Sequence, residues 1–410
     1  MNVDDLVRDA LRAEAADTAP VPDGFADRVL AARRRRTRRG LLGAAAVTAV
    51  VVAVAVAVPV LDGSGKEDVR PASQTQTADV IAHPDQSPPR DLIAAGNTAL
   101  AGYTTGKRIK LDNGDELFKR TFWVLDQKTG KYEKADKRWA WIDVAPGMRT
   151  AAVLEGELPA RRIGLLNLLT GEVERWIPVD HPIAGVEWSP DGSRLSATAY
   201  SKNPDRLIDL PNDHPDNEPQ PHGSRTGFMV VDVDSGKVGP FRSLPQKKTD
   251  DKFGMFLGNS REDLRWSHDG TLLYEQLAMG GDGENRKWYT QEGQKTKPPA
   301  GERYAGWPEA GLSPDGKTLA GDGSDKGSPI FDPATGKQIG KVPGQQLLAW
   351  ADNKRIIAWG CDPKKCDGKG EFRNQLLLVT VGSRKAVPLS DFRKASDDYP
   401  GRWSPLFADR

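Results

Sequence analysis

The longest apolar stretch of the chain lies near its beginning. Residues 41–61 contain no charged side chain and consist almost wholly of Ala, Val and Leu. At about 1.5 Å of rise per residue, a helix of this length reaches roughly 30 Å, the thickness of the hydrocarbon core of a bilayer. A buried core helix is seldom so long and so uniform. The pattern predicts a transmembrane helix over 41–61.

Arginines crowd the side of this segment that precedes it. Six of the seven residues 33–39 are Arg, and no comparable cluster follows the segment. Because basic residues favour the cytoplasmic side, the N-terminus is predicted to be cytoplasmic and residues 62–410 to lie outside. Residues 1–40 form a basic cytoplasmic segment whose short Leu, Val and Ala faces predict helical structure.

A cleaved export signal is the alternative to this signal-anchor. Residues 37–42, Thr-Arg-Arg-Gly-Leu-Leu, resemble a twin-arginine signal, and the small residues at 53–55 or 55–57 suit a cleavage site. Cleavage would give a secreted protein. We favour retention, because 40 residues precede the apolar run and the run continues past these alanines to spanning length. No Cys lies near its end, so a lipoprotein anchor is excluded.

The pattern changes twice after the apolar segment. Residues 62–90 are polar and rich in Gly, Ser, Gln and Pro, without apolar periodicity, which predicts a disordered linker. From residue 91 to residue 410, short apolar runs alternate with turn residues, as in a domain built of β-strands.

One turn signature in 91–410 is Ser-Pro-Asp-Gly between two apolar strands. It stands at 189–192 and 313–316, and with one change at 267–270. Weaker copies begin at Ala145 and Ala351. Pro presets φ at the second turn position, Asp bonds to the local backbone, and Gly adopts the left-handed conformation. Each copy predicts a β-hairpin.

A second signature alternates with the first. It is an apolar pair followed by Asp or Asn, with Gly four residues later, and its polar positions are Asp126, Asn167, Asp232 and Asp332. Degenerate copies surround Gly293 and Gly382. This is the pattern of another hairpin. The fixed offset from Gly indicates turn capping, so these residues are not interpreted as metal ligands.

Two hairpins per repeat make four strands. The glycines of successive second signatures are 41 to 65 residues apart, and a four-stranded unit of about 40–50 residues with insertions is the blade of a β-propeller. A generic β-sandwich does not explain the alternation. We therefore predict an all-β fold, with a propeller of six visible blades. Residues 403–405 would start a seventh blade, or a strand that closes the ring against the first.

Together, the two signatures resemble the TolB-type repeat, a relative of the WD-type propeller repeat. The resemblance is strong over roughly 130–390 and weaker over 91–130. It suggests a membrane-anchored TolB-like protein of bacterial, actinobacterial-looking type. Propellers of this kind can be joined to a serine-peptidase domain, but no Gly-x-Ser-x-Gly nucleophile elbow occurs here.

The balance of charges excludes nucleic acid as a partner. The whole chain has a formal charge of +1, and 49 basic and 50 acidic residues remain for 62–410 once 1–40 are subtracted. Such a balance gives no electrostatic footprint for nucleic acid.

Three tryptophans, Trp188, Trp266 and Trp350, stand at the same place, directly before the first turn of their repeats. A ring for stacking ligands is one interpretation. Packing between blades is the interpretation we favour, because aromatic residues that recur at one structural position are usually buried.

The insertion 201–225 is the place where metal ligands would be sought. It contains two His and three acidic residues, namely Asp213, His214, Asp216, Glu218 and His222. Imidazole and carboxylate are suitable donors, but their spacing matches no compact motif. We expect a solvated loop, with no metal and no other cofactor.

Two cysteines, Cys361 and Cys366, are separated by four residues in one polar stretch. On the oxidising side of a membrane they predict a local disulfide. A redox pair usually has two intervening residues, and a metal site needs two more ligands.

Catalysis is not expected. There is no phosphate loop and no His-Glu-x-x-His motif, and the five His are scattered. The leading hypothesis is a binding module of the cell envelope for a protein, peptide or glycan, with binding loops such as 201–225, 242–262 and 275–310. Two alternatives stay open: a transmembrane regulator whose N-terminal segment binds a cytoplasmic partner such as a sigma factor, and a hydrolase or lyase with carboxylates at the propeller centre.

Overall fold

A computed structural model describes residues 78–209, 222–244, 261–277, 285–323, 327–360, 374–393 and 402–410. All of them belong to one compact unit, Glu67–Arg410. Apart from one short 3₁₀ helix, η3 (Ala300–Glu302), the regular elements described are β-strands in five antiparallel sheets. The predicted all-β class is confirmed. No helix within the described ranges is long and apolar enough to span a bilayer, and 1–77, with the predicted cytoplasmic and transmembrane segments, lie outside them.

The first sheet joins the two ends of the domain. Its strands are β1 (Val80–Ile81), β2 (Ala94–Ala95), β3 (Thr98–Lys110), β4 (Glu116–Asp126), β5 (Lys131–Lys134), β11 (Arg206–Leu207) and β25 (Trp403–Asp409). The C-terminal strand β25 pairs with β3 over the register Trp403↔Thr105 to Asp409↔Thr98. The last strand of the chain is therefore held by one of the first.

The second sheet contains seven strands because one long strand serves two groups. Its strands are β6 (Trp139–Val144), β7 (Thr150–Glu155), β8 (Ala160–Asn167), β9 (Val173–Trp188), β10 (Arg194–Tyr200), β12 (Arg225–Asp232) and β13 (Arg242–Ser243). β9 pairs with β8 as far as Ile183, and with β10 from Ile183 to Trp188. β9 thus ends one four-stranded group and starts the next.

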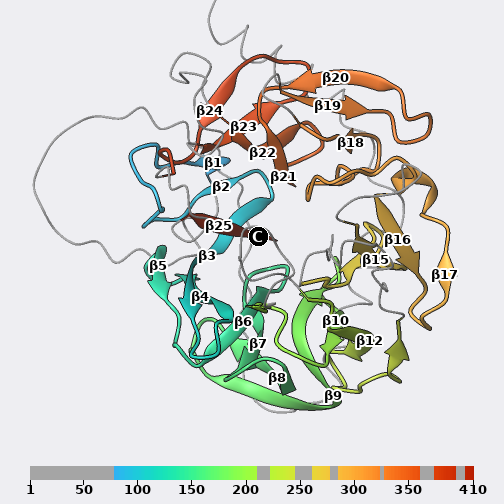
Figure 1. Ribbon diagram of the computed structural model, residues 1–410. Helices are drawn as coiled ribbons and strands as arrows, with labels where there is room; N and C mark the ends of the chain where they lie inside the picture. Colours follow the sequence, from blue (N-terminus) through green and yellow to red (C-terminus); the bar gives the residue numbers. More distant parts are fainter. Residues whose placement is uncertain are drawn as a thin grey trace, which may run out of the picture. The chain divides into compact units, whose positions relative to one another are not determined.

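Three smaller sheets complete the unit, and the five sheets follow one another around a common centre in Figure 1. Their strands are β14 (Arg265–Trp266), β15 (Leu273–Gln276), β16 (Arg286–Tyr289) and β17 (Lys295–Thr296); β18 (Leu319–Ala320), β19 (Ser328–Phe331) and β20 (Gln338–Val342); and β21 (Gln346–Trp350), β22 (Arg355–Gly360), β23 (Gln375–Thr380) and β24 (Ala386–Pro388). A bridge between Leu312 and Leu319 adds a short first strand to the three-stranded sheet.

The two turn signatures form the hairpins that were predicted. In the first signature, Ser189 Oγ donates to Asp191 Oδ1 at 2.6 Å, and Gly192 has φ +69°. The same bond forms between Ser267 and Asp269, and between Ser313 and Asp315. In the second signature, the polar residue accepts backbone N–H groups of its own turn, as the predicted cap requires; these residues are Asp126, Asn167, Asp232 and Asp332.

The three repeated tryptophans pack between neighbouring strand groups. Each indole N–H donates to a backbone carbonyl of the preceding group: Trp188 to Asp143, Trp266 to Glu187 and Trp350 to Gly311, at 3.1, 3.1 and 3.2 Å. All three side chains are buried. The packing interpretation is confirmed, and these residues do not form an exposed stacking ring.

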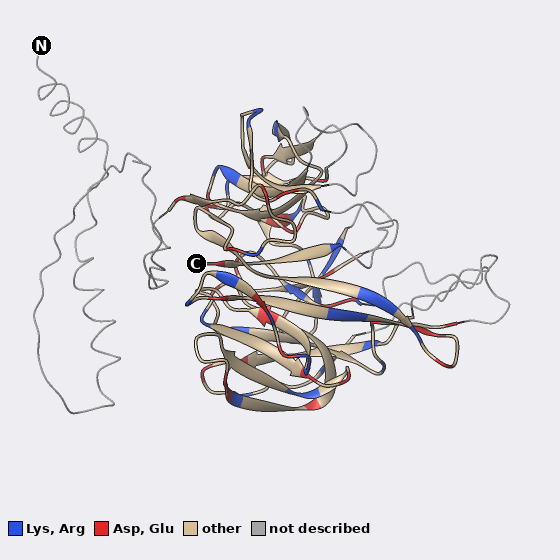
Figure 2. Cartoon of the chain, turned by 90° about the vertical axis from the view of Figure 1, so that its left-hand side faces the viewer, with Lys and Arg blue, Asp and Glu red and all other residues tan. Residues whose placement is uncertain are grey.

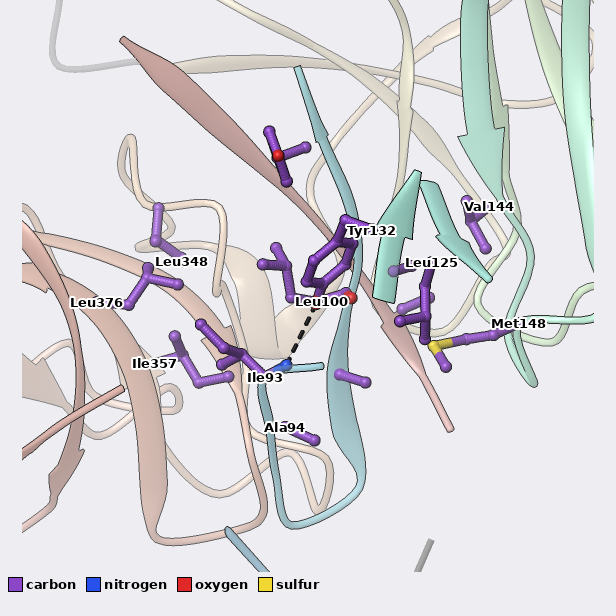
Figure 3. Packing of buried hydrophobic residues seen from close by; sticks show 14 of the residues in the cluster. Ile93, Ala94, Leu100, Leu125, Tyr132, Val144, Met148, Leu348, Ile357 and Leu376 are labelled. Atoms are coloured by element: carbon purple, nitrogen blue, oxygen red, sulfur yellow. Dashed lines mark hydrogen bonds between the residues drawn. The ribbon is translucent and has the colours of Figure 1, made fainter. Parts of the chain in front are cut away.

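The largest core cluster links the first sheet to the last (Figure 3). Ile93 and Leu100 lie against Leu348, Leu376 and their neighbours. Tyr132 OH donates to Leu100 O at 2.7 Å and accepts the Ile93 N–H at 3.2 Å, so the buried hydroxyl is satisfied on both sides. Apolar burial fastens the beginning of the domain to its end.

The prediction places the end of the linker, residue 90, too late in the chain. Val80 and Ile81 pair with Ala95 and Ala94, so the fold begins before residue 91. The composition of 62–90 hid this because a two-residue strand creates no periodicity, and its pairing partners lie in a separate hairpin. Residues 62–77 of the linker lie outside the described residues.

Candidate functional site

The two ends of the sheets differ in their connections. Because antiparallel neighbours run in opposite directions, successive connections alternate between the two ends of a sheet. The repeated tight turns occupy one end, here named the turn face. The other end, the loop face, has the connections between second and third strands: 111–115 after β3, 156–159 after β7, and 201–224 after β10. Connections at the loop face need not keep the geometry of a tight turn, so their sequences can vary more freely.

A cavity of about 1030 Å³ lies at the loop face, between the first sheet and the two halves of the second. Six Lys or Arg and four Asp or Glu line it, with apolar and amide side chains between them. The charged residues are Lys119, Arg120, Lys137, Arg138, Lys202, Arg206, Asp115, Glu157, Asp205 and Asp209. The volume is at the upper end of the range for small-ligand sites, so it can admit a short peptide or a saccharide.

Asp205 forms part of the cavity wall and is clamped by two arginines. Arg261 contacts both carboxylate oxygens, with Nε 3.1 Å from Oδ1 and Nη2 2.7 Å from Oδ2. Arg120 Nη1 lies 2.5 Å from Oδ2. Burial works against ionisation of Asp205, but the charges of Arg261 and Arg120 and their hydrogen bonds outweigh it, and the pKa falls to about 2. Asp205 therefore remains a buried carboxylate.

A second clamp holds the same segment to the hairpin of the first sheet. Arg206 Nε donates to Asp115 Oδ2 at 2.5 Å, and the Asp209 N–H donates to Asp115 Oδ1 at 2.9 Å. Burial opposes the charge of Asp115, yet hydrogen bonds from Asp209, Asn113 and Arg206 together lower its pKa. The two clamps hold 205–209 against β4.

Three lysines give the cavity unpaired positive charge. Lys119, Lys137 and Lys202 are exposed, and none has an ion-pair partner among the described residues. His222 also lines the cavity, and burial together with the charge of Lys202 lowers its pKa. Figure 2 shows Lys and Arg along the strands at the right of that view. Six basic against four acidic side chains give the cavity lining a net positive charge.

A different group of charges lies on the inner strands. Arg265 stands between two carboxylates, with Nε 4.0 Å from Glu187 Oε2 and Nη2 3.7 Å from Glu309 Oε1. Burial raises the pKa of Asp143 to about 7, although it accepts the Trp188 N–H at 2.8 Å. Burial likewise raises the pKa of Glu187 to about 8, partly offset by Arg265. These carboxylates take up protons near neutral pH.

The structure describes only part of the predicted loop chemistry. His222 reaches the cavity, whereas residues 210–221 and the cysteines Cys361 and Cys366 lie outside the described residues. Within the described ranges, no three His, Cys, Asp or Glu gather in a way that suits a metal ion. The disulfide stays a prediction.

Sequence reasoning identified the insertion but not the clamp. Arg120, Asp205 and Arg261 belong to no motif, and 85 and 56 residues separate them along the chain. The only available signal was that Asp205 lies in an insertion interrupting a regular repeat.

Comparison with known proteins places this chain among distant structural neighbours. No protein-family model matches the sequence, and no curated protein matches it. TolB from Acinetobacter baumannii is 14% identical, with 73% of this chain and 68% of that chain covered and a TM-score of 0.37. The β-propeller domain of Cps50 (Swd1) from Myceliophteria thermophila is 13% identical, with 72% and 87% covered and a TM-score of 0.34.

Proposed function

We propose that this protein is a membrane-anchored binding module of the cell envelope. Its extracytoplasmic domain would be a six-bladed β-propeller, and the cavity at the loop face would receive an acidic segment of a partner protein. The anchor is the apolar segment 41–61, oriented by the arginines before it. No cofactor and no enzymatic activity belong to this proposal.

Strand pairing supports the count of six blades. The strands fall into six groups of four when β9 is shared and the bridge at Leu312 is counted: β25-β3-β4-β5, β6-β7-β8-β9, β9-β10-β12-β13, β14 to β17, Leu312-β18-β19-β20, and β21 to β24. In this arrangement Trp403 begins the inner strand of the first blade, and no seventh blade is needed. Such pairing of the two chain ends would close the ring.

The observation that carries the binding role is the cavity with its three unpaired lysines. The strands around it are anchored in sheets, so most of its wall is in place before a ligand arrives. Three mobile cations at the rim attract carboxylates without the cost of breaking an existing ion pair. An acidic peptide segment matches both the charge and the volume.

The first described residues of the domain are held by arginines at the turn face. Asp79 accepts hydrogen bonds from Arg355 Nη1 and Nη2 at 2.6 and 2.7 Å, and Arg410 Nη2 donates to Ala78 O. Arg355 directly follows the tight turn 351–354, so residues 78 and 79 lie at the turn face.

Binding is tested with a capped tetraglutamate peptide and the full-length protein. Replacing Lys119, Lys137 and Lys202 together by Gln should weaken binding at least about tenfold, since three cations leave the site. The matched control replaces the exposed Lys131, Lys295 and Lys337, which do not line the cavity. Tetraglutamine reports non-ionic binding. Equal affinity in the two triple variants would remove the acidic-segment proposal.

Topology is tested separately by fractionation. Retention of the full-length chain in the membrane supports the anchor, whereas a soluble mature form beginning near Val58 supports the twin-arginine alternative. A thiol assay on denatured, unreduced protein should find no free thiol if Cys361 and Cys366 are bridged. Two free thiols would argue against both the disulfide and the extracytoplasmic location.

Asp143 and Glu187 favour one second candidate, the carboxylate-based hydrolase or lyase. Their raised pKa values would let one of them act as a general acid near neutral pH. Release of new reducing ends from a polysaccharide, abolished by Asp143→Asn or Glu187→Gln, would support this function. Against it, Asp143 already accepts a backbone N–H.

A further inference from the structure

The two arginines around Asp205 are held by contacts that do not involve Asp205. Arg261 Nη1 donates to Ala184 O at 2.8 Å and lies 3.0 Å from Asp263 Oδ2. Its guanidinium is 4.1 Å from the centre of the Trp141 ring. Aromatic stacking and a fixed fork restrict a guanidinium strongly. Arg261 would keep its place if Asp205 left.

Arg120 is fixed independently as well. It lies within β4 and is paired with Gly106 of β3. Its guanidinium is 4.9 Å from the Phe118 ring and 5.4 Å from the Trp141 ring. The two cations therefore form a preorganised pair that presents N–H donors to a single carboxylate position.

Asp205, in contrast, lies on a connection with little regular secondary structure. The connection 201–209 contributes only the two-residue strand β11 to a sheet, although Leu207 and Ile208 are more than half buried. Its other attachments are polar: Arg206 and the Asp209 N–H bond to Asp115, the Phe118 N–H bonds to Asp205 O, and Ser201 and Lys202 bond to Ser224. A connection with two strand residues and mainly polar attachments opens at lower cost than the sheets around it.

We propose that Asp205 is an internal stand-in for a carboxylate of the partner, which displaces it from the Arg120 and Arg261 pair when an acidic segment enters the cavity. The inference rests on the proposed function of that cavity, whose lining includes both Arg120 and Asp205. The free protein keeps the pair neutralised, and the incoming group is an Asp or Glu side chain or a C-terminal carboxylate.

Exchange of one carboxylate for another avoids the main cost of opening a buried ion pair. Separating buried charges leaves uncompensated ions in a poorly solvated place. Here one carboxylate enters as the other leaves, so Arg120 and Arg261 face a negative charge throughout. Asp205 moves to solvent, where a carboxylate is well hydrated, while Arg206 and Asp115 can retain the segment.

Substitution of Asp205 by Asn tests the exchange, because Asn keeps the size and removes the competing charge. In the full-length protein, Asp205→Asn should bind capped tetraglutamate at least about tenfold more tightly than the unaltered chain. The matched control is Asp209→Asn, which removes the same charge from the same cavity without touching either arginine. Its affinity should change less than about threefold.

The outcomes separate this inference from the function on which it rests. Tighter binding by both variants alike, or no gain for Asp205→Asn, overturns the stand-in role even when the lysine triple variant still weakens binding. If Asp205→Asn folds poorly, acetate should raise its Tm while NaCl at equal ionic strength does not. Absence of an acetate-specific rise then overturns the carboxylate site.

Discussion

Asp205 at the cavity and Asp143 on inner strand β6 are both carboxylates removed from water, but their pKa values move in opposite directions. The pKa of Asp205 falls to about 2, and that of Asp143 rises to about 7. Burial opposes ionisation at both sites. The difference lies in their neighbours: two guanidiniums contact Asp205 directly, whereas Asp143 is hydrogen-bonded to a neutral backbone N–H.

Direct contact with cations thus decides which buried carboxylate stays charged. Glu187 is intermediate between these two cases, because its cation is near but not in close contact. Arg265 is 4.0 Å away, and the pKa of Glu187 still rises to about 8. At the loop face, Asp205 and Asp115 stay ionised beside arginines. On the inner strands, Asp143 and Glu187 hold protons near neutral pH. The two regions should therefore respond differently to charge removal and to pH.

The largest expected effect comes from removing the forked cation. Arg261→Met leaves Asp205 buried with Arg120 as its one cationic contact among the described residues, and breaking a buried pair in this way costs about 3–5 kcal/mol of the free energy of unfolding. Arg265→Met should cost far less, because Glu187 can take up a proton when its cation is lost. Denaturant unfolding at pH 7, followed by tryptophan fluorescence, measures both. Equal losses would refute the contrast.

The next largest effect is the pH dependence of the stability that Asp205 contributes to the fold. Its folded-state pKa lies below the ordinary value of 3.8, so its stabilisation is fully present above pH 4 and is lost as pH falls towards 2. The unaltered chain should exceed Asp205→Asn by roughly 2 kcal/mol at neutral pH, and the gap should close in acid. Unfolding curves between pH 2 and 7 test this. A gap that does not change with pH would assign the loss to packing.

The features of the fold that could be predicted from the sequence are those that depend on residues close together along the chain. The Ser-Pro-Asp-Gly turn at 189–192 is specified by its own φ angles and side-chain bonds, so it can be recognised without knowledge of the rest. The caps at Asp126 and Asp332 and the packing role of Trp188 follow in the same way from recurrence.

What stayed hidden depends on how distant strands meet. The Arg120, Asp205 and Arg261 cluster forms only after the first sheet, the 201–209 segment and the approach to β14 come together. No spacing rule connects residues that far apart. The strand Val80–Ile81 escaped detection for the same reason, since its partner is another two-residue strand.

Asp143 should show the reverse of the Asp205 behaviour. Its folded-state pKa of about 7 exceeds 3.8, so the folded state holds the extra proton and loses stability as pH rises from 4 to 7. Asp143→Asn, which is neutral throughout and can still accept the Trp188 N–H, should be more stable than the unaltered chain by about 1–2 kcal/mol at pH 8. Calorimetry at pH 5 and pH 8 detects the reversal. A variant that is less stable at pH 8 would contradict it.

The smallest effect is expected at Glu187, although burial raises its pKa as it raises that of Asp143. Its side chain keeps 36% of its surface exposed, and water that reaches a carboxylate reduces the energetic consequence of any shift. Glu187→Gln should therefore gain less than about 1 kcal/mol at pH 9 and nothing at pH 4. Because Arg265 also contacts Glu309, that pair should keep Arg265 neutralised in the variant. A gain larger than that of Asp143→Asn would mean that solvent does not reach the inner carboxylates, and burial alone would then set their titration.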